Sequence, residues 1–321
     1  MSDQSVTQPA RALGGMETIS VTTTRRVAAR VARKRRRFSP FLALVYVFLV
    51  VMSVFSLFPV YFVIQASLSG TQSLYTTDLH LFPVHPAFSN FTHVLQNPDQ
   101  LRLLNWIANT FYVTGLATFL GLALSTTGAY ALSRFRFRGR QMSLVFLLSL
   151  QAFPGLLAVV GFYSILIYLH FYNVVTGVSL TGLALVYSAG TVTFGAWNLR
   201  GYFDTIPVEL EQAAWVDGAT PTQAFFRVAL PLASPALAAT AMLMFIGMWN
   251  EFALANYLLN SNLTGSNLTF AVGIQTLQSD YRTPWGYFAA ASVIVSTPLM
   301  AVFLYAQRFF KSGLTIGSVK G

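Results

Sequence analysis

The pattern of apolar and polar positions is dominated by long apolar stretches, and a helix that crosses a membrane needs about 20 mostly apolar residues. Stretches without Asp, Glu, Lys or Arg mark the candidates, and the longest, 141–199, exceeds one span. Polarity rises at 170–173, which divides that stretch into two. The pattern predicts an all-α polytopic membrane protein with six transmembrane helices, at residues 41–66, 106–133, 142–168, 180–200, 232–259 and 286–310.

The basic residues of the connecting segments predict the orientation of these spans. Eighteen of the 20 Lys and Arg residues lie in the N-terminal segment, the second and fourth connections and the C-terminal tail. The opposite connections hold only Arg102 and Arg282. Because cytoplasmic loops carry the excess of Lys and Arg, both termini are expected to be cytoplasmic.

The composition supports the membrane class and excludes several others. The chain has 321 residues, of which 55% are hydrophobic and 9% charged, and its mean hydropathy is +0.58. A soluble domain carries about 25% charged residues, so an ordinary soluble enzyme, a disordered chain and a nucleic-acid-binding module are excluded. The net charge of +10 includes a basic run at 33–37 directly before the first span. We interpret this run as a topology anchor beside anionic lipid, in preference to a nucleic-acid arm.

The polar segments divide the chain into three regions. Residues 1–37 form a basic cytoplasmic segment that is expected to be mobile. A six-span transmembrane domain is predicted over 38–310, followed by a cytoplasmic tail at 311–321. The longest external connection, 67–102, has room for a short helix near 91–97. The chain has no Cys and its four His lack ligand spacing, so no metal site is expected.

The cytoplasmic connection at 204–230 is predicted to fold as two short helices joined by a tight turn. Pro207 suits the first turn of a helix, and Gly218 is placed to end that helix with a positive φ. Thr220 and Pro221 then match the N-cap and first position of a second helix. Four of the ten acids of the chain lie here, which disfavours a helix lying on anionic lipid. A docking element for a protein partner is the preferred interpretation.

Residues 211–219, with the sequence Glu-Gln-Ala-Ala-Trp-Val-Asp-Gly-Ala, together with Leu230, Pro231 and Pro235, resemble the "EAA" loop of permease subunits of binding-protein-dependent ABC importers. The resemblance implies the type I permease fold of ABC importers, with a core module at about 104–308. It also implies that this loop is a coupling helix seated in a cleft of a cytoplasmic ATPase. The residues that carry this role by position are Glu211, Gln212, Ala213, Ala214, Asp217 and Gly218.

One position departs from the family pattern. Gln212 occupies the place of the family's Glu, and its uncharged amide cannot pair with a basic residue of the ATPase as a carboxylate could. Glu211 points about 100° away from it on a helix. The small residues retain their steric role, whereas the contribution of charge to docking stays open.

Further segments resemble carbohydrate permeases, in particular the second permease of maltose/maltodextrin importers. These are 109–111, 129–134, 249–252, 286–291 and 313–321. The resemblance implies an ATP-driven importer of maltose, maltodextrin or a related oligosaccharide in a bacterial or archaeal cytoplasmic membrane. Its partners would be a second, different permease, an ABC ATPase homodimer, an external sugar-binding protein and membrane lipid, with no nucleic acid. The chain lacks a phosphate-binding loop and a catalytic motif, so it is expected to be no enzyme; ATP and Mg²⁺ would belong to the ATPase.

Candidate residues for the substrate pathway or gate are Trp249, Asn250 and Glu251. Glu251 is the one acid inside a predicted span, and an acid within the membrane by default marks a polar path or a partner in the bundle. A structural hydrogen bond is the alternative, and the resemblance implies that the other permease holds most of the sugar. Gln151 is a second candidate, and Pro154 is expected to kink its span.

Three rival functions were weighed. The same machinery could carry another substrate, such as a different disaccharide or a glycerol phosphate. An ion-coupled secondary transporter would need acids in several spans, and only Glu251 is available. An intramembrane enzyme would need a convergent catalytic pair, which the sequence does not offer.

Overall fold

The computed structural model describes residues 40–70, 82–83, 86, 88–96, 102–174, 177–259, 265–278 and 283–316, with side chains up to 309. The predictions for segment 1–37, for Arg282 and for Lys320 lie outside the described residues. The boundary between the two structural units of the chain falls within the first helix, after Val60.

Within the described residues, four helices are long and apolar enough to cross a membrane. They are α2 (Pro40–Leu68), α4 (Leu103–Arg134), α7 (Leu180–Phe203) and α14 (Trp285–Ile316). The shortest, α7, has 24 residues, which span about 36 Å at 1.5 Å per residue and so exceed the hydrocarbon core of about 30 Å. Each contains one predicted span, and α14 continues beyond the expected end at 310.

Two bent pairs of helices overlap the two remaining predicted spans, 142–168 and 232–259. Helix α5 (Arg140–Ala152) meets η1 (Gly155–Ala158) and α6 (Val159–Tyr168) at 93°. The break falls at Pro154, as the kink prediction requires, because proline cannot donate the helical hydrogen bond. The second pair joins residues 221–232 to α11 (Ser234–Trp249) at 72°. If each pair counts as one span, the described residues contain six candidate spans.

The span predicted at 232–259 also ends earlier than expected. Helix α11 stops at Trp249, and a separate helix, α12 (Ala253–Leu259), follows after three residues. Glu251 therefore lies in the break between two helices and not inside a continuous one. The break coincides with polar Asn250 and Glu251, and the sequence analysis missed it because it took both residues as part of one continuous span.

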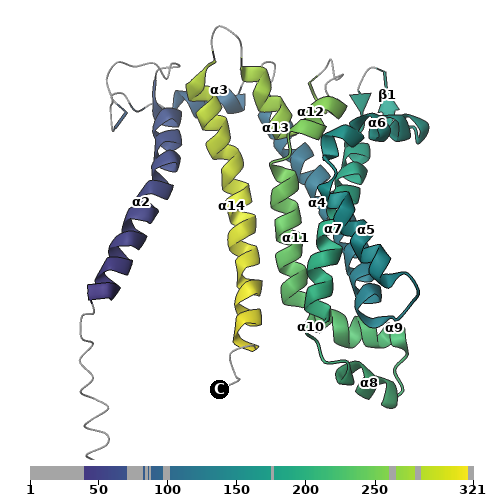
Figure 1. Cartoon of the computed structure of the whole chain (residues 1–321). Coiled ribbons are helices and arrows are strands. Elements are labelled where there is room, and N and C mark those ends of the chain that lie inside the picture. Colours follow the sequence, from purple (N-terminus) through teal and green to yellow (C-terminus); the bar gives the residue numbers. More distant parts are fainter. Residues whose placement is uncertain are drawn as a thin grey trace, which may run out of the picture. The chain divides into compact units, whose positions relative to one another are not determined.

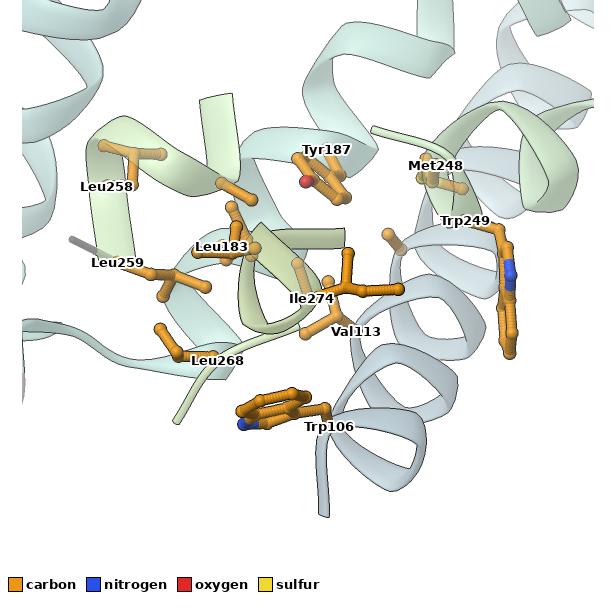
Figure 2. Close-up of a cluster of buried hydrophobic side chains, with 14 of the residues drawn as sticks. Trp106, Val113, Leu183, Tyr187, Met248, Trp249, Leu258, Leu259, Leu268 and Ile274 are labelled. Carbon is orange, nitrogen blue, oxygen red and sulfur yellow. The ribbon is translucent and has the colours of Figure 1, made fainter. Parts of the chain in front are cut away.

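Helices α4, α7 and α11 pack together within the unit Tyr61–Gly321. Close approach depends on glycine: a Cβ on Gly195 of α7 would overlap Ser125 of α4 and Met244 of α11. Above this contact lies a buried apolar cluster, shown in Figure 2, whose labelled members include Trp106, Val113, Leu183 and Trp249. The three helices therefore form the packed centre of this unit.

Short elements gather at the two ends of the same unit (Figure 1). One end holds α3 (Ser89–Gln96), α13 (Phe270–Gly273), η3 (Ile274–Leu277) and the antiparallel pair β1 (Tyr172–Asn173) and β2 (Gly177–Val178). Helix α3 confirms the short helix expected near 91–97. The other end holds α8 (Glu209–Val216), α9 (Pro221–Ala224), the π-helical turn η2 (Phe225–Ala229) and α10 (Leu230–Leu232).

Candidate functional site: a helical docking element and a polar cavity

The docking element has the local structure that the sequence predicts. Helix α8 ends at a turn in which Gly218 has a φ of +89°. Thr220 is the N-cap of α9, and its hydroxyl accepts a hydrogen bond from the backbone N–H of Gln223 while the Gln223 side chain accepts one from the Thr220 N–H. Pro207 precedes the helix, which begins at Glu209, two residues later than expected.

Glu211 is turned inward, toward α4. Its side chain is 2% exposed, and Oε1 accepts a hydrogen bond from Arg134 Nε at 2.7 Å. Oε2 accepts one from the Tyr130 hydroxyl at 2.6 Å. Arg134 also donates to the Ile206 carbonyl at 3.0 Å. Glu211 therefore cannot offer its charge to a partner protein, and its observed role is to hold α8 against the end of α4.

Aromatic packing completes this anchor. The Tyr130 ring lies 5.7 Å from that of Phe203 and 4.5 Å from that of Phe225, between centroids. Phe203 ends α7, and Phe225 follows α9. The three rings join α4, α7 and the docking element in one buried cluster. Sequence reasoning missed Tyr130 and Arg134, since no spacing rule relates residues 77 positions apart.

The outer side of α8 is exposed and carries apolar side chains beside the polar Glu209, Gln212 and Asp217. Val216 is 88% exposed, and Leu210 is about half exposed. Gln212, Ala213, Asp217 and Gly218 are exposed as well, whereas Ala214 is half-buried. Five of the six predicted coupling residues thus lie together at this surface or its edge, and Glu211 lies behind it. Such an exposed apolar surface is typical of a protein interaction site.

Glu251 is bound entirely by groups of its own chain. Its carboxylate accepts hydrogen bonds from the Tyr187 hydroxyl and from the backbone N–H groups of Leu254 at 2.7 Å and Ala255 at 3.1 Å. It therefore caps the start of α12 and ties this helix to α7. This arrangement matches the structural alternative, although Glu251 still lines a cavity.

That cavity lies between α5, α7 and α11 and has a volume of about 690 Å³. Its polar lining includes Gln151, Tyr187, Thr191, Thr193 and Glu251, among mainly apolar neighbours. The structure thus brings Gln151 and Glu251, both predicted candidates, to one space. No Lys or Arg contributes to this lining among the described residues.

Trp249 and Asn250 do not join that cavity. Trp249 is 3% exposed and packs edge-to-face on Phe111 at 4.7 Å and against Phe245 at 5.6 Å, between centroids. The Asn250 amide donates to the Ile246 carbonyl at 2.8 Å and so remains with its own helix. Figure 2 shows Trp249 and Tyr187 on separate helices. Of the three predicted pathway residues, only Glu251 reaches the cavity. Among the described residues, no group of three or more His, Asp or Glu could hold a metal ion.

This architecture is that of a helical membrane permease with a protruding docking element. The chain belongs to the family described as the binding-protein-dependent transport system inner membrane component, which matches residues 117–315. The matched region contains α7, the docking element and the cavity-lining helices.

Named relatives and solved structures agree with this assignment. A maltose/maltodextrin transport system permease protein MalG of Vibrio vulnificus (strain YJ016) is 41% identical over 224 residues, 70% of this chain and 75% of the relative. MalG of Escherichia coli (strain K12) is 40% identical over the same shares. A bacterial ABC transporter involved in the import of alginate has the same fold, with a TM-score of 0.69 and 24% identity over 84% of this chain and 96% of that chain.

Proposed function

We propose that this protein is the permease subunit of an ATP-driven importer for maltose, maltodextrin or a related oligosaccharide in the cytoplasmic membrane of a bacterium. It would cross the membrane six times, with α5 and α6 forming one span, α11 and α12 forming another, and both termini in the cytoplasm. It would form half of the pathway, beside a second permease, and receive sugar from an external binding protein. It would bind no ATP itself.

The observation that carries this proposal is that the docking element is fixed to α4 on its inner side. Helix α8 offers an exposed apolar surface on one side and is joined by the Glu211–Arg134 ion pair to α4 on the other. A force exerted on α8 by an ATPase is therefore transmitted to a helix long enough to cross the membrane. An uncharged Gln212 at the surface is compatible with docking, because the contact would be mainly apolar.

The cavity favours a neutral substrate over a glycerol phosphate. Its polar groups are hydroxyls, an amide and a carboxylate already bound by its own chain. A phosphate would face Glu251 without a cation in this lining, which is unfavourable in a low-dielectric site. Reconstituted uptake should therefore accept maltose or maltodextrin and reject glycerol 3-phosphate; the reverse preference would contradict the substrate assignment.

Co-purification with the ATPase tests the docking surface. Val216→Arg should abolish co-purification, because it places a charge at the centre of the apolar surface. Val174→Arg is the matched control, since Val174 is 81% exposed but lies beside β1, at the other end of the unit (Figure 1). Equal loss in both variants, or in neither, would contradict docking through α8.

Labelling with a membrane-impermeant maleimide tests the orientation. The chain has no native Cys, so single cysteines report without background. Val216→Cys should be labelled only after the cells are opened, whereas Phe88→Cys should be labelled in intact cells. The opposite result would reverse the proposed topology.

A further inference from the structure

A second cavity, of about 540 Å³, lies on the inner side of the docking element, between the end of α4 and helices α8 and α9. Its volume is within the range of ligand sites, about 300–1,000 Å³. Val208, Glu211 and Trp215 of the docking element face it. Gln212, Ala213 and Val216 do not line it, so this cavity is separate from the surface assigned to the ATPase.

The cavity carries unneutralised positive charge. Arg134, Arg136 and Arg140 line it, and the one acid in its lining is Glu211. Arg134 and Glu211 neutralise each other in their ion pair. Arg140 donates only to the carbonyls of Leu132 and Ser133, which leave its charge intact. Arg136 is exposed and has no ion pair recorded among the described residues. Two guanidinium charges therefore remain for a ligand.

The remaining walls are mainly apolar, with the hydroxyl groups of Thr127, Tyr130, Ser133 and Thr222 among them, and they follow α4 away from its C-terminal end. Ala131, Phe135, Val208 and Phe225 contribute apolar surface. The lining begins at Thr127, seven residues before α4 ends at Arg134, which is about 10 Å along the helix axis. The cavity is thus cationic at the helix end and apolar toward the membrane, the same polarity that an anionic phospholipid has.

We propose that this cavity is a binding site for a phospholipid with an anionic headgroup. Arg136 and Arg140 would hold the phosphate, and the groove along Ala131 and Thr127 would receive the start of an acyl chain. Guanidinium groups suit this role because they bind phosphate oxygens in pairs. A lipid seated here would touch both α4 and α8 and would support the contact that transmits force from the ATPase. The orientation of the site rests on the proposed function.

Native mass spectrometry of the full chain, in micelles with equal amounts of phosphatidylglycerol and phosphatidylcholine, tests the site. The wild type should retain phosphatidylglycerol preferentially. Arg136→Gln should lower its occupancy about five-fold, the size expected for one guanidinium near an anionic surface. Arg138→Gln is the matched control: Arg138 is exposed in the same loop, does not line the cavity and should change occupancy less than two-fold.

Two further experiments identify which anion is bound and where the lipid lies. Inorganic phosphate should not displace the lipid; displacement would overturn the lipid assignment in favour of a soluble anion. Brominated phosphatidylglycerol should quench the fluorescence of Trp215. The quenched part of the tryptophan fluorescence should be missing in Trp215→Phe. Equal effects of Arg136→Gln and Arg138→Gln would overturn the site, because they indicate diffuse attraction. These measurements need no ATPase, so a failed co-purification would reject the proposed function and leave the lipid result standing.

Discussion

Removing the charge of Glu211 should detach α8 from α4. In Glu211→Gln the guanidinium of Arg134, whose side chain is 8% exposed, stays buried without a counter-charge. Breaking a buried ion pair from one side costs about 3–5 kcal/mol. The chain can avoid this cost by releasing α8 into water, where Arg134 is solvated, because α8 has only eight residues and Glu211 is its one buried residue.

The cost of losing the ion pair can be measured as the decrease in the free energy needed to detach α8 from α4. A loss of about 3 kcal/mol corresponds to amide hydrogen exchange roughly a hundredfold faster across 209–216, at about tenfold per 1.4 kcal/mol. The same variant should hydrolyse ATP in the assembled transporter with little uptake, since the ATPase would move a loose helix. Exchange at α12, far along the chain, should remain unchanged.

Asp204 provides the matched control. Its carboxylate accepts a hydrogen bond from Ser133 at 2.6 Å, beside Arg134, but this contact is exposed. Exposed pairs contribute about 0–1 kcal/mol, so Asp204→Asn should accelerate exchange less than about five-fold. A double-mutant cycle with Arg134→Gln completes the test. If Glu211→Gln exchanges no faster than Asp204→Asn, the ion pair does not anchor α8 and the reasoning is refuted.

Three other substitutions test separate contacts. Glu251→Gln weakens the cap of α12 by about 1–2 kcal/mol and should reduce uptake while chain yield is kept; unchanged uptake would dismiss Glu251 as a functional residue. Gly218→Ala forces a side chain to a φ of +89° at a cost of about 1–2 kcal/mol and should weaken ATPase co-purification, whereas Gly201→Ala, which meets open space, should not. Gly195→Ala should lower the melting temperature because its Cβ overlaps two helices, at a cost of about 1–3 kcal/mol, and Gly190→Ala should leave it unchanged.

The membrane class and the folded docking element could be predicted because both depend on local chemistry. The docking element follows from residues within a few positions of one another. Gly218 permits the left-handed turn, and Thr220 caps the helix that it precedes. Each of the four long helices likewise follows from one continuous apolar stretch. The break between Trp249 and Ala253 was harder to predict, because two polar residues, Asn250 and Glu251, flanked by apolar stretches are also compatible with one continuous span.

The partners of the two informative acids could not be predicted. Glu211 meets Arg134 across 77 residues, and Glu251 meets Tyr187 across 64. From the sequence, Glu211 was a candidate for contact with the ATPase and Glu251 for contact with the substrate. Tertiary structure turned both inward, because a buried carboxylate needs donors and the packed helices supply them. It also separated Trp249 from Glu251, since neighbouring residues at a helix end point in different directions.

By itself, the sequence determined that the chain enters a membrane, approximately where its four long helices lie, and that a short acidic loop folds as two short helices. These properties come from hydrophobic transfer and from backbone preferences, which act within a few residues. Only the tertiary structure decided which charges are available to partners, which line a cavity and which hold helices together. Those outcomes depend on the distances between segments remote in sequence, and these distances are set by the packing of α4, α7 and α11.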